Sequence, residues 1–120
     1  MTLTALATGL AWLGVAITAA LALVCLRNPA EGLRHLSHRP EHLPEVMEGR
    51  YLAFFGFSVF VALYGDFTVL GFWGLALGFM AMADTFIYLR AGKSWGRHAA
   101  AALAALVVTT VAFLAASEVA

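Results

Sequence analysis

Residues 67–89 read FTVLGFWGLALGFMAMADTFIYL, and Asp84 is the one charged residue among them. A helix needs about 20 mostly apolar residues to cross the hydrocarbon core of a bilayer. The stretch meets that requirement, and it is therefore predicted to be a transmembrane helix with an acid inside it.

Three other stretches of the chain have the same character. The predicted spans cover about residues 3–26, 44–64, 67–89 and 98–116. The first has no charge and is longer than the apolar region of a signal peptide, which runs to about 7–15 residues, so we expect it to be retained. Hydrophobic residues make up 62% of the 120 residues and charged residues 12%, more apolar surface than a small soluble domain can bury. We predict an all-α fold, an antiparallel bundle of four transmembrane helices that forms one membrane domain over residues 1–120.

The segments between the spans carry clear turn signals. Gly65-Asp66 predicts a tight turn between the second and third spans. Asn28-Pro29 ends the first span, and Asn28 can cap a new helix whose first residue is the proline. Residues 30–37 are predicted to form that short helix, which mixes polar and apolar side chains and should lie in the membrane interface until Arg39-Pro40 breaks it.

The positive charges predict the orientation of the chain. All seven fall in or at the edge of the first and third connecting segments: Arg27, Arg34, Arg39, Arg50, Arg90, Lys93 and Arg97. Cytoplasmic loops collect Lys and Arg. We therefore expect both segments to face the cytoplasm and both termini to lie on the opposite side of a bacterial inner membrane. The net charge of zero argues against nucleic acid as a partner, and the single cysteine, Cys25, excludes an internal disulfide.

Asp84 is the most informative residue of the chain. It lies six residues before Arg90, and thus about 9 Å inside the end of the predicted helix. An ionisable group at that depth costs at least a few kcal/mol if it is unpaired, so it should have a partner. A hairpin that turns at Gly65-Asp66 brings Arg50 near the level of Ala81, about 4.5 Å along the axis from Asp84.

These heights predict a polar cluster near the cytoplasmic face. Asp84 and Arg50 are the candidate catalytic residues, and the candidates for contact with a ligand are Glu48, Tyr88, His98, Phe54 and Phe57. Tyr88 lies one turn from Asp84 on the same helix face. Two interpretations stay open: an ion pair that only joins two helices, or a functional site.

Two further groups of residues have spacings that suggest a role. His35, His38 and His42 have spacings that suit metal ligands, but Pro40 interrupts their helix, so no metal is predicted and the role of the segment stays open. No cofactor motif appears, and no histidine lies deep in a span, as a haem would need. Small residues on the third and fourth spans predict close helix packing, either within the chain or in a homodimer: Gly71, Gly74, Gly78 and the alanine-rich residues 99–105.

Residues 83–92, ADTFIYLRAG, and His98 at the start of a small-residue helix carry a resemblance. They resemble a family of small bacterial and fungal four-helix membrane proteins of unknown function that is similar to the DoxX-like proteins. The second helix of that family often begins with a Gly-x-Arg-Asp pattern, which this chain matches at Arg50 and departs from at Tyr51, where an acid is usual. The resemblance covers about residues 28–110. It implies a four-helix bundle and no established reaction.

Three functions follow as alternatives. The first is binding or transformation of a small lipophilic molecule, such as a quinone, a sterol-like or a polyketide-like compound, at the Arg/Asp cluster. The second is a non-catalytic accessory subunit of a larger membrane complex. The third is a small transporter, which the absence of an acid in the first span and the strong charge bias argue against. Whether the protein is an enzyme stays open. The expected partners are the lipid bilayer, a lipophilic ligand, and a second copy or a larger complex.

Overall fold

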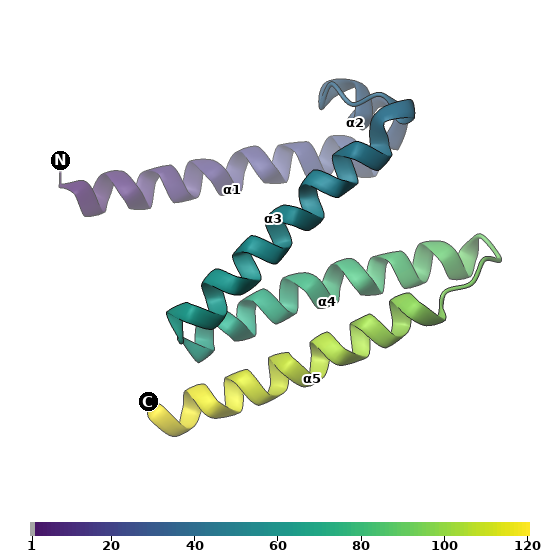
Figure 1. The fold of residues 1–120 in the computed structure, drawn as a ribbon. Coiled ribbons are helices and arrows are strands. Elements are labelled where there is room, and N and C mark those ends of the chain that lie inside the picture. The colour runs from purple at the N-terminus through teal and green to yellow at the C-terminus, as the bar shows by residue number, and fades with distance from the viewer. Residues whose placement is uncertain (1) are drawn as a thin grey trace. The chain divides into compact units, whose positions relative to one another are not determined.

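The computed structural model describes residues 2–120, apart from the burial of positions 8, 9 and 14. Throughout this range the ordered elements are helices (Figure 1): α1 (Leu3–Arg27), α2 (Pro29–His35), the short 3-10 helix η1 (Pro40–His42), α3 (Leu43–Tyr64), α4 (Phe67–Arg90) and α5 (Gly96–Val119). Four helices, α1, α3, α4 and α5, are long and apolar enough to cross a membrane. The predicted all-α class and the four spanning helices are confirmed, and they indicate a multi-pass membrane protein.

The chain forms two compact units, Met1–Arg50 and Tyr51–Ala120, and the division falls inside α3. A four-helix bundle and a single domain would both require a defined packing of one unit on the other. These two features therefore stay predictions.

In the first unit, the short helix α2 forms as the Asn28-Pro29 signal predicts. The Asn28 side chain accepts a hydrogen bond from the Glu31 backbone N–H at 3.3 Å, and Pro29 occupies the first helical position. The contact with α1 is close at Gly32, where an added Cβ would lie 2.6 Å from the Cys25 Sγ. The helix ends at His35, two residues before its predicted end, and its place in the membrane interface stays a prediction.

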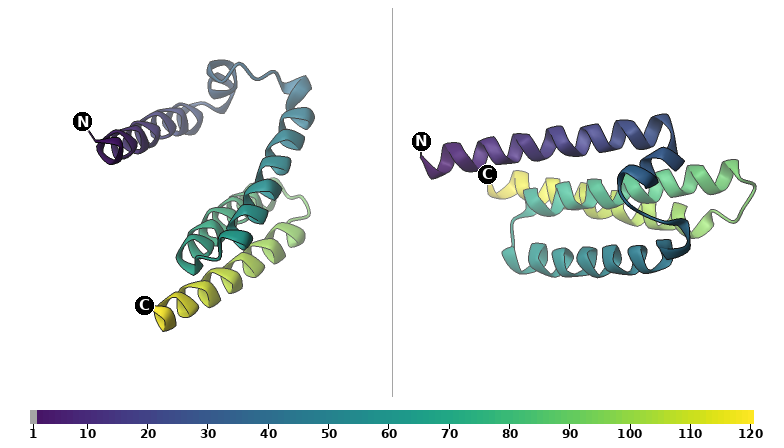
Figure 2. Two further views of the ribbon diagram at one scale, coloured as in Figure 1. Left: turned by 60° about the vertical axis from the view of Figure 1, so that its left-hand side comes forward. Right: turned by 90° about the horizontal axis from the view of Figure 1, so that it is seen from above.

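In the second unit, α4 and α5 run side by side in opposite directions, as Figures 1 and 2 show. Glycines of α4 permit the close approach, because a Cβ added to them would meet the facing helix: Phe113 at Gly71, Thr109 at Gly74 and Ala105 at Gly78. Ala102 and Ala112 of α5 are buried. The small residues therefore pack helices within the chain. A homodimer face elsewhere on the protein stays a prediction.

The turn between α3 and α4 confirms the Gly65-Asp66 signal. Gly65 has a φ of 75°, a conformation that glycine adopts without strain. The Asp66 Oδ1 accepts hydrogen bonds from the backbone N–H groups of Thr68 at 2.8 Å and Val69 at 3.1 Å, which caps α4. The turn thus fixes which residues of the two helices lie at the same height.

Candidate functional site

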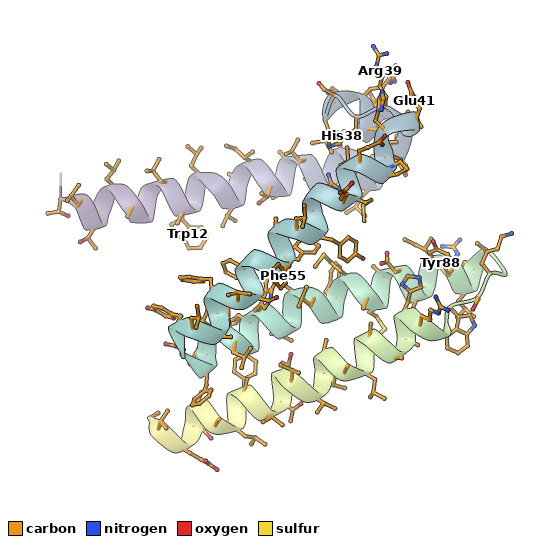
Figure 3. The ribbon with its side chains drawn as sticks, in the orientation of Figure 1. Trp12, His38, Arg39, Glu41, Phe55 and Tyr88 are labelled. Carbon is orange, nitrogen blue, oxygen red and sulfur yellow. The ribbon has the colours of Figure 1, made fainter. Side chains whose placement is uncertain are left out.

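Three polar or aromatic side chains meet near the loop end of α4 and α5. The His98 Nδ1 lies 3.7 Å from the Asp84 Oδ2. Tyr88 lies one turn after Asp84 on α4, and its ring stacks on the His98 imidazole with 4.6 Å between centroids. Figure 3 shows Tyr88 near the end of α4, where the loop begins. The structure therefore brings together three of the predicted site residues.

Three aromatic side chains of the same unit, Phe54, Phe57 and Trp73, form a group in which Trp73 contacts the other two, and we call them the aromatic wall. The Trp73 ring makes edge contacts with Phe54 at 5.9 Å and Phe57 at 4.7 Å between centroids. Its indole N–H donates a hydrogen bond to the Ser58 Oγ at 2.9 Å. Trp73 is part-buried, and an indole N–H usually finds a partner when it is buried, so this bond orients the Trp73 ring and links α3 to α4 at this height.

A cavity of about 540 Å³ has Asp84 and His98 in its lining together with Phe54 and Trp73 of the aromatic wall, and all of its lining falls within residues 51–108. Its lining comes from α3, α4 and α5 and includes Tyr51, Phe54, Trp73, Asp84 and His98, with alanines and leucines between them. We call it the Asp84 cavity. Pockets for small molecules are typically 300–1,000 Å³ in volume, apolar for the most part, with a few convergent polar groups. The cavity has this size and this composition.

The geometry of the polar group leaves room for a ligand atom. The separation of 3.7 Å between the Asp84 carboxylate and His98 is too long for a direct hydrogen bond. A hydroxyl placed beside the pair can donate to the carboxylate while its oxygen accepts from an imidazole N–H. A hydrogen bond with a charged partner is about twice as strong as one between neutral groups.

The other predicted site residues lie elsewhere or stay untested. Phe57 packs against Trp73 but does not line the Asp84 cavity. Glu48 and Arg50 belong to the first unit, where the Arg50 Nη2 lies 3.3 Å from the His38 Nε2. The predicted pairing of Arg50 with Asp84 joins residues of different units and stays a prediction.

The three histidines between α1 and α3 each contact a different charged residue. Within residues 2–120, no three His, Cys, Asp or Glu side chains gather in a way that could hold a metal ion. The contacts are His35 with Glu31 at 3.8 Å, His42 with Glu45 at 4.0 Å and His38 with Arg50 at 3.3 Å.

Sequence reasoning missed Tyr51, Ser58 and Trp73 as residues of the cavity. A signal for two of them exists. Ser58 lies seven residues before Gly65 and Trp73 lies seven residues after Asp66, so a hairpin at this turn places them at the same height. The hydrogen bond between them confirms that register.

No protein-family model, curated protein or solved structure matches the chain.

Proposed function

We propose that this protein binds a small lipophilic molecule with a hydroxyl group in the Asp84 cavity. The observation that carries the proposal is an apolar space of about 540 Å³ with Asp84 and His98 together in its lining. The hydroxyl contacts the Asp84 carboxylate and the His98 imidazole, and the apolar body lies against Phe54 and Trp73. A quinol is a ligand of this kind, since it combines a flat ring with hydroxyl groups.

The same pair of side chains supports proton exchange with the ligand. A carboxylate and an imidazole within reach of one hydroxyl can accept its proton and return it. The proposal therefore includes both plain binding and proton transfer, with Asp84 and His98 as the groups that touch the ligand.

We further propose the setting of the site in the membrane. The basic segments around residues 27–50 and 90–97 face the cytoplasm of a bacterium, which puts Asp84 near the cytoplasmic side of the inner membrane. The resemblance of residues 83–92 to DoxX-like proteins is consistent with a four-helix bundle as part of this proposal.

Quenching of Trp73 fluorescence by a short-chain benzoquinone tests the binding proposal. The chain has three tryptophans, so the Trp12→Phe/Trp95→Phe variant reports on Trp73 alone. Because Trp73 lines the cavity, we expect its quenching to saturate as the quinone is titrated into protein in detergent micelles. The corresponding quinol, which has the proposed hydroxyl groups, should displace the quinone and reverse the quenching.

The matched control is the Trp73→Phe/Trp95→Phe variant, which keeps Trp12. Trp12 lies on α1 and is 70% exposed, so collisions in the micelle should quench it linearly without saturation. Linear quenching of both variants would contradict the proposal and favour the alternative of an accessory subunit.

Labelling of single cysteines tests the orientation. In a Cys25→Ala background, Ser94→Cys places a thiol in the loop after α4 and Ser117→Cys places one near the end of α5, and both positions are exposed. A membrane-impermeant maleimide applied to intact spheroplasts should label the Ser117→Cys protein and leave the Ser94→Cys protein unlabelled until the membrane is opened. The reverse pattern would show that the chain is inserted the other way.

A further inference from the structure

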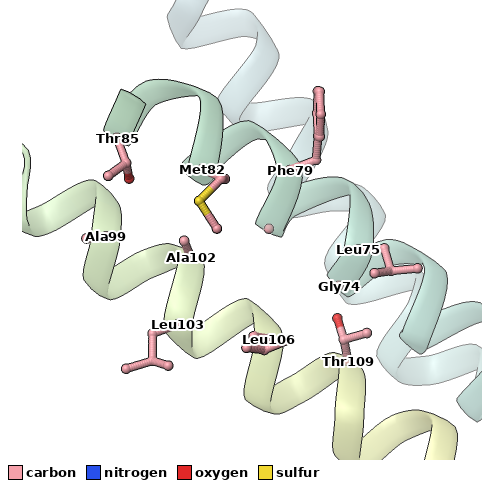
Figure 4. Close-up of a pocket in the computed structure, with 11 residues that line it drawn as sticks. Gly74, Leu75, Phe79, Met82, Thr85, Ala99, Ala102, Leu103, Leu106 and Thr109 are labelled. Carbon is pink, nitrogen blue, oxygen red and sulfur yellow. The ribbon is translucent and has the colours of Figure 1, made fainter. Parts of the chain in front are cut away.

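A second cavity, of about 460 Å³, lies along the α4–α5 pair. Figure 4 shows this apolar groove between the two helices, and its walls include Leu75, Phe79 and Met82 of α4 with Ala99, Leu103 and Leu106 of α5. Among the described residues it shares one with the Asp84 cavity, Gly74, which lies in the helix contact itself. The apolar groove is therefore a separate surface.

The walls of the apolar groove offer a ligand almost no polar group. Of its two threonines, Thr85 donates its hydroxyl to the Ala81 carbonyl at 2.7 Å. The Thr109 Oγ1 is buried in the helix contact against Gly74. An occupant of the groove must therefore be apolar along its length.

Positive charge gathers at the loop end of the groove. Arg90, Lys93 and Arg97 lie between residues 90 and 97, and the sequence has no acid from residue 85 to residue 117. The Arg90 guanidinium lies 5.5 Å from the centre of the Phe86 ring. Phe86 follows Met82 of the groove wall by one helical turn and therefore lies on the same side of α4. An occupant that reaches this end meets these cations, and the one nearby acid in the sequence, Asp84, belongs to the lining of the other cavity.

The length of the groove matches the depth of one lipid leaflet. Along α5 it runs from Ala99 to Thr109, which is about 15 Å of helix at 1.5 Å per residue. The hydrocarbon core of a bilayer is about 30 Å thick, so the groove reaches from the basic loop to about the midplane. Trp95 in the loop is a residue type that favours the headgroup level.

We propose that the apolar groove binds one acyl chain of an anionic phospholipid, whose phosphate is held by Arg90, Lys93 and Arg97. Charge complementarity selects an anionic headgroup, and the apolar walls select an acyl chain that lies along α4 and α5. The site is independent of the ligand proposed for the Asp84 cavity, since the two cavities have different linings.

Native mass spectrometry of the full-length protein in a non-ionic detergent tests this inference. The probes are phosphatidylglycerol and phosphatidylcholine with identical acyl chains, added at equal concentration. Cations near a membrane surface each favour anionic lipid several-fold, so retention of one phosphatidylglycerol should exceed that of phosphatidylcholine on the order of tenfold or more. Equal retention of the two lipids would overturn the proposal.

Two sets of variants separate the headgroup from the acyl chain. The triple variant Arg90→Gln/Lys93→Gln/Arg97→Gln should lose the headgroup preference, whereas Arg34→Gln/Arg39→Gln, which removes cations from the other basic segment, should keep it. If both variants lose the headgroup preference equally, the anionic headgroup is not bound specifically by the loop between α4 and α5, and the proposal fails.

For the acyl chain, Ala99→Leu narrows the apolar groove and should lower the retention of both lipids, whereas Ala100→Leu, an exposed neighbour outside the groove, should not. A dimer lost in Ala99→Leu, with unchanged lipid retention, would show that a second copy occupies the groove instead.

If a variant does not fold, the wild-type protein still provides a test, because retention of phosphatidylglycerol should rise with the length of its acyl chains. No dependence on chain length would overturn the proposal.

Discussion

Replacing Gly74 with alanine is expected to lower the free energy of unfolding by about 1–3 kcal/mol, the usual cost of forcing an extra carbon into a packed interface. A Cβ at this position would meet the Thr109 Oγ1 of the facing helix. Because lipid tails provide no hydrophobic force between helices, close packing of backbones is a main source of helix association in a membrane. Unfolding of the purified protein in mixed micelles by a denaturing detergent measures the effect.

A matched glycine controls for helix propensity. Gly56 lies on α3, and an added Cβ there would meet nothing within 4 Å. Gly56→Ala should therefore stabilise the protein by up to about 1 kcal/mol, because alanine is the better helix former. A loss of stability of equal size in both variants would contradict the packing argument.

Thr109 on the facing helix provides a second test of the packing at Gly74. Thr85 and Thr110 donate their hydroxyls to carbonyls four residues earlier, but the Thr109 Oγ1 is buried without a hydrogen-bond partner in the part of the chain that the structure describes. The Thr109 Oγ1 occupies the space that a Cβ on Gly74 would need. Thr109→Ala removes the atom that clashes, so it should rescue much of the loss in Gly74→Ala, and a double-mutant cycle measures that coupling. Purely additive effects would show that the two residues do not meet.

The spanning helices could be predicted from the sequence because the bilayer imposes their length. With no water available, each span must be a helix of about 20 apolar residues, and polar signals such as Gly65-Asp66 mark where it ends. The boundaries differ from the structure mainly at α5, which begins at Gly96 and ends at Val119 where residues 98 and 116 were expected. The short 3-10 helix Pro40–His42 was not predicted, since one proline signals only that the preceding helix stops.

The candidate site could be predicted only in part. Burial of a charge in a membrane requires a partner, and this reasoning pointed to Asp84 and its neighbours Tyr88 and His98. His98 was expected to complete the cluster at Asp84, but the sequence did not predict their separation, because the conformation of the loop between α4 and α5 is not encoded by a periodic pattern. The hydrogen bond between Trp73 and Ser58 was not predicted, because it depends on the register of α3 and α4 about their turn.

Replacing Asp84 with asparagine is expected to weaken binding of a quinol in the Asp84 cavity by tenfold or more. A hydrogen bond to a charged group contributes about 1.5–3 kcal/mol, and 1.4 kcal/mol corresponds to a factor of ten in affinity. The oxidised quinone has carbonyl oxygens and no hydroxyl, so it donates nothing to the carboxylate. Its affinity, measured by quenching of Trp73, should change much less, and displacement of the quinone by the quinol measures the quinol affinity.

The ratio of the two affinities separates a ligand contact from a structural role. If Asp84 only pins α4 to its neighbours, Asp84→Asn should lower stability and weaken quinone and quinol alike. The chain has one other aspartate, Asp66, at the opposite end of α4, where asparagine caps a helix about as well. Asp66→Asn makes the same chemical change and should alter neither affinity. If Asp84→Asn leaves the ratio of the quinone and quinol affinities unchanged, the Asp84 carboxylate does not contact the quinol hydroxyl. Asp84 is the one acid among the described residues that line the cavity, so no other carboxylate there could make this contact in its place.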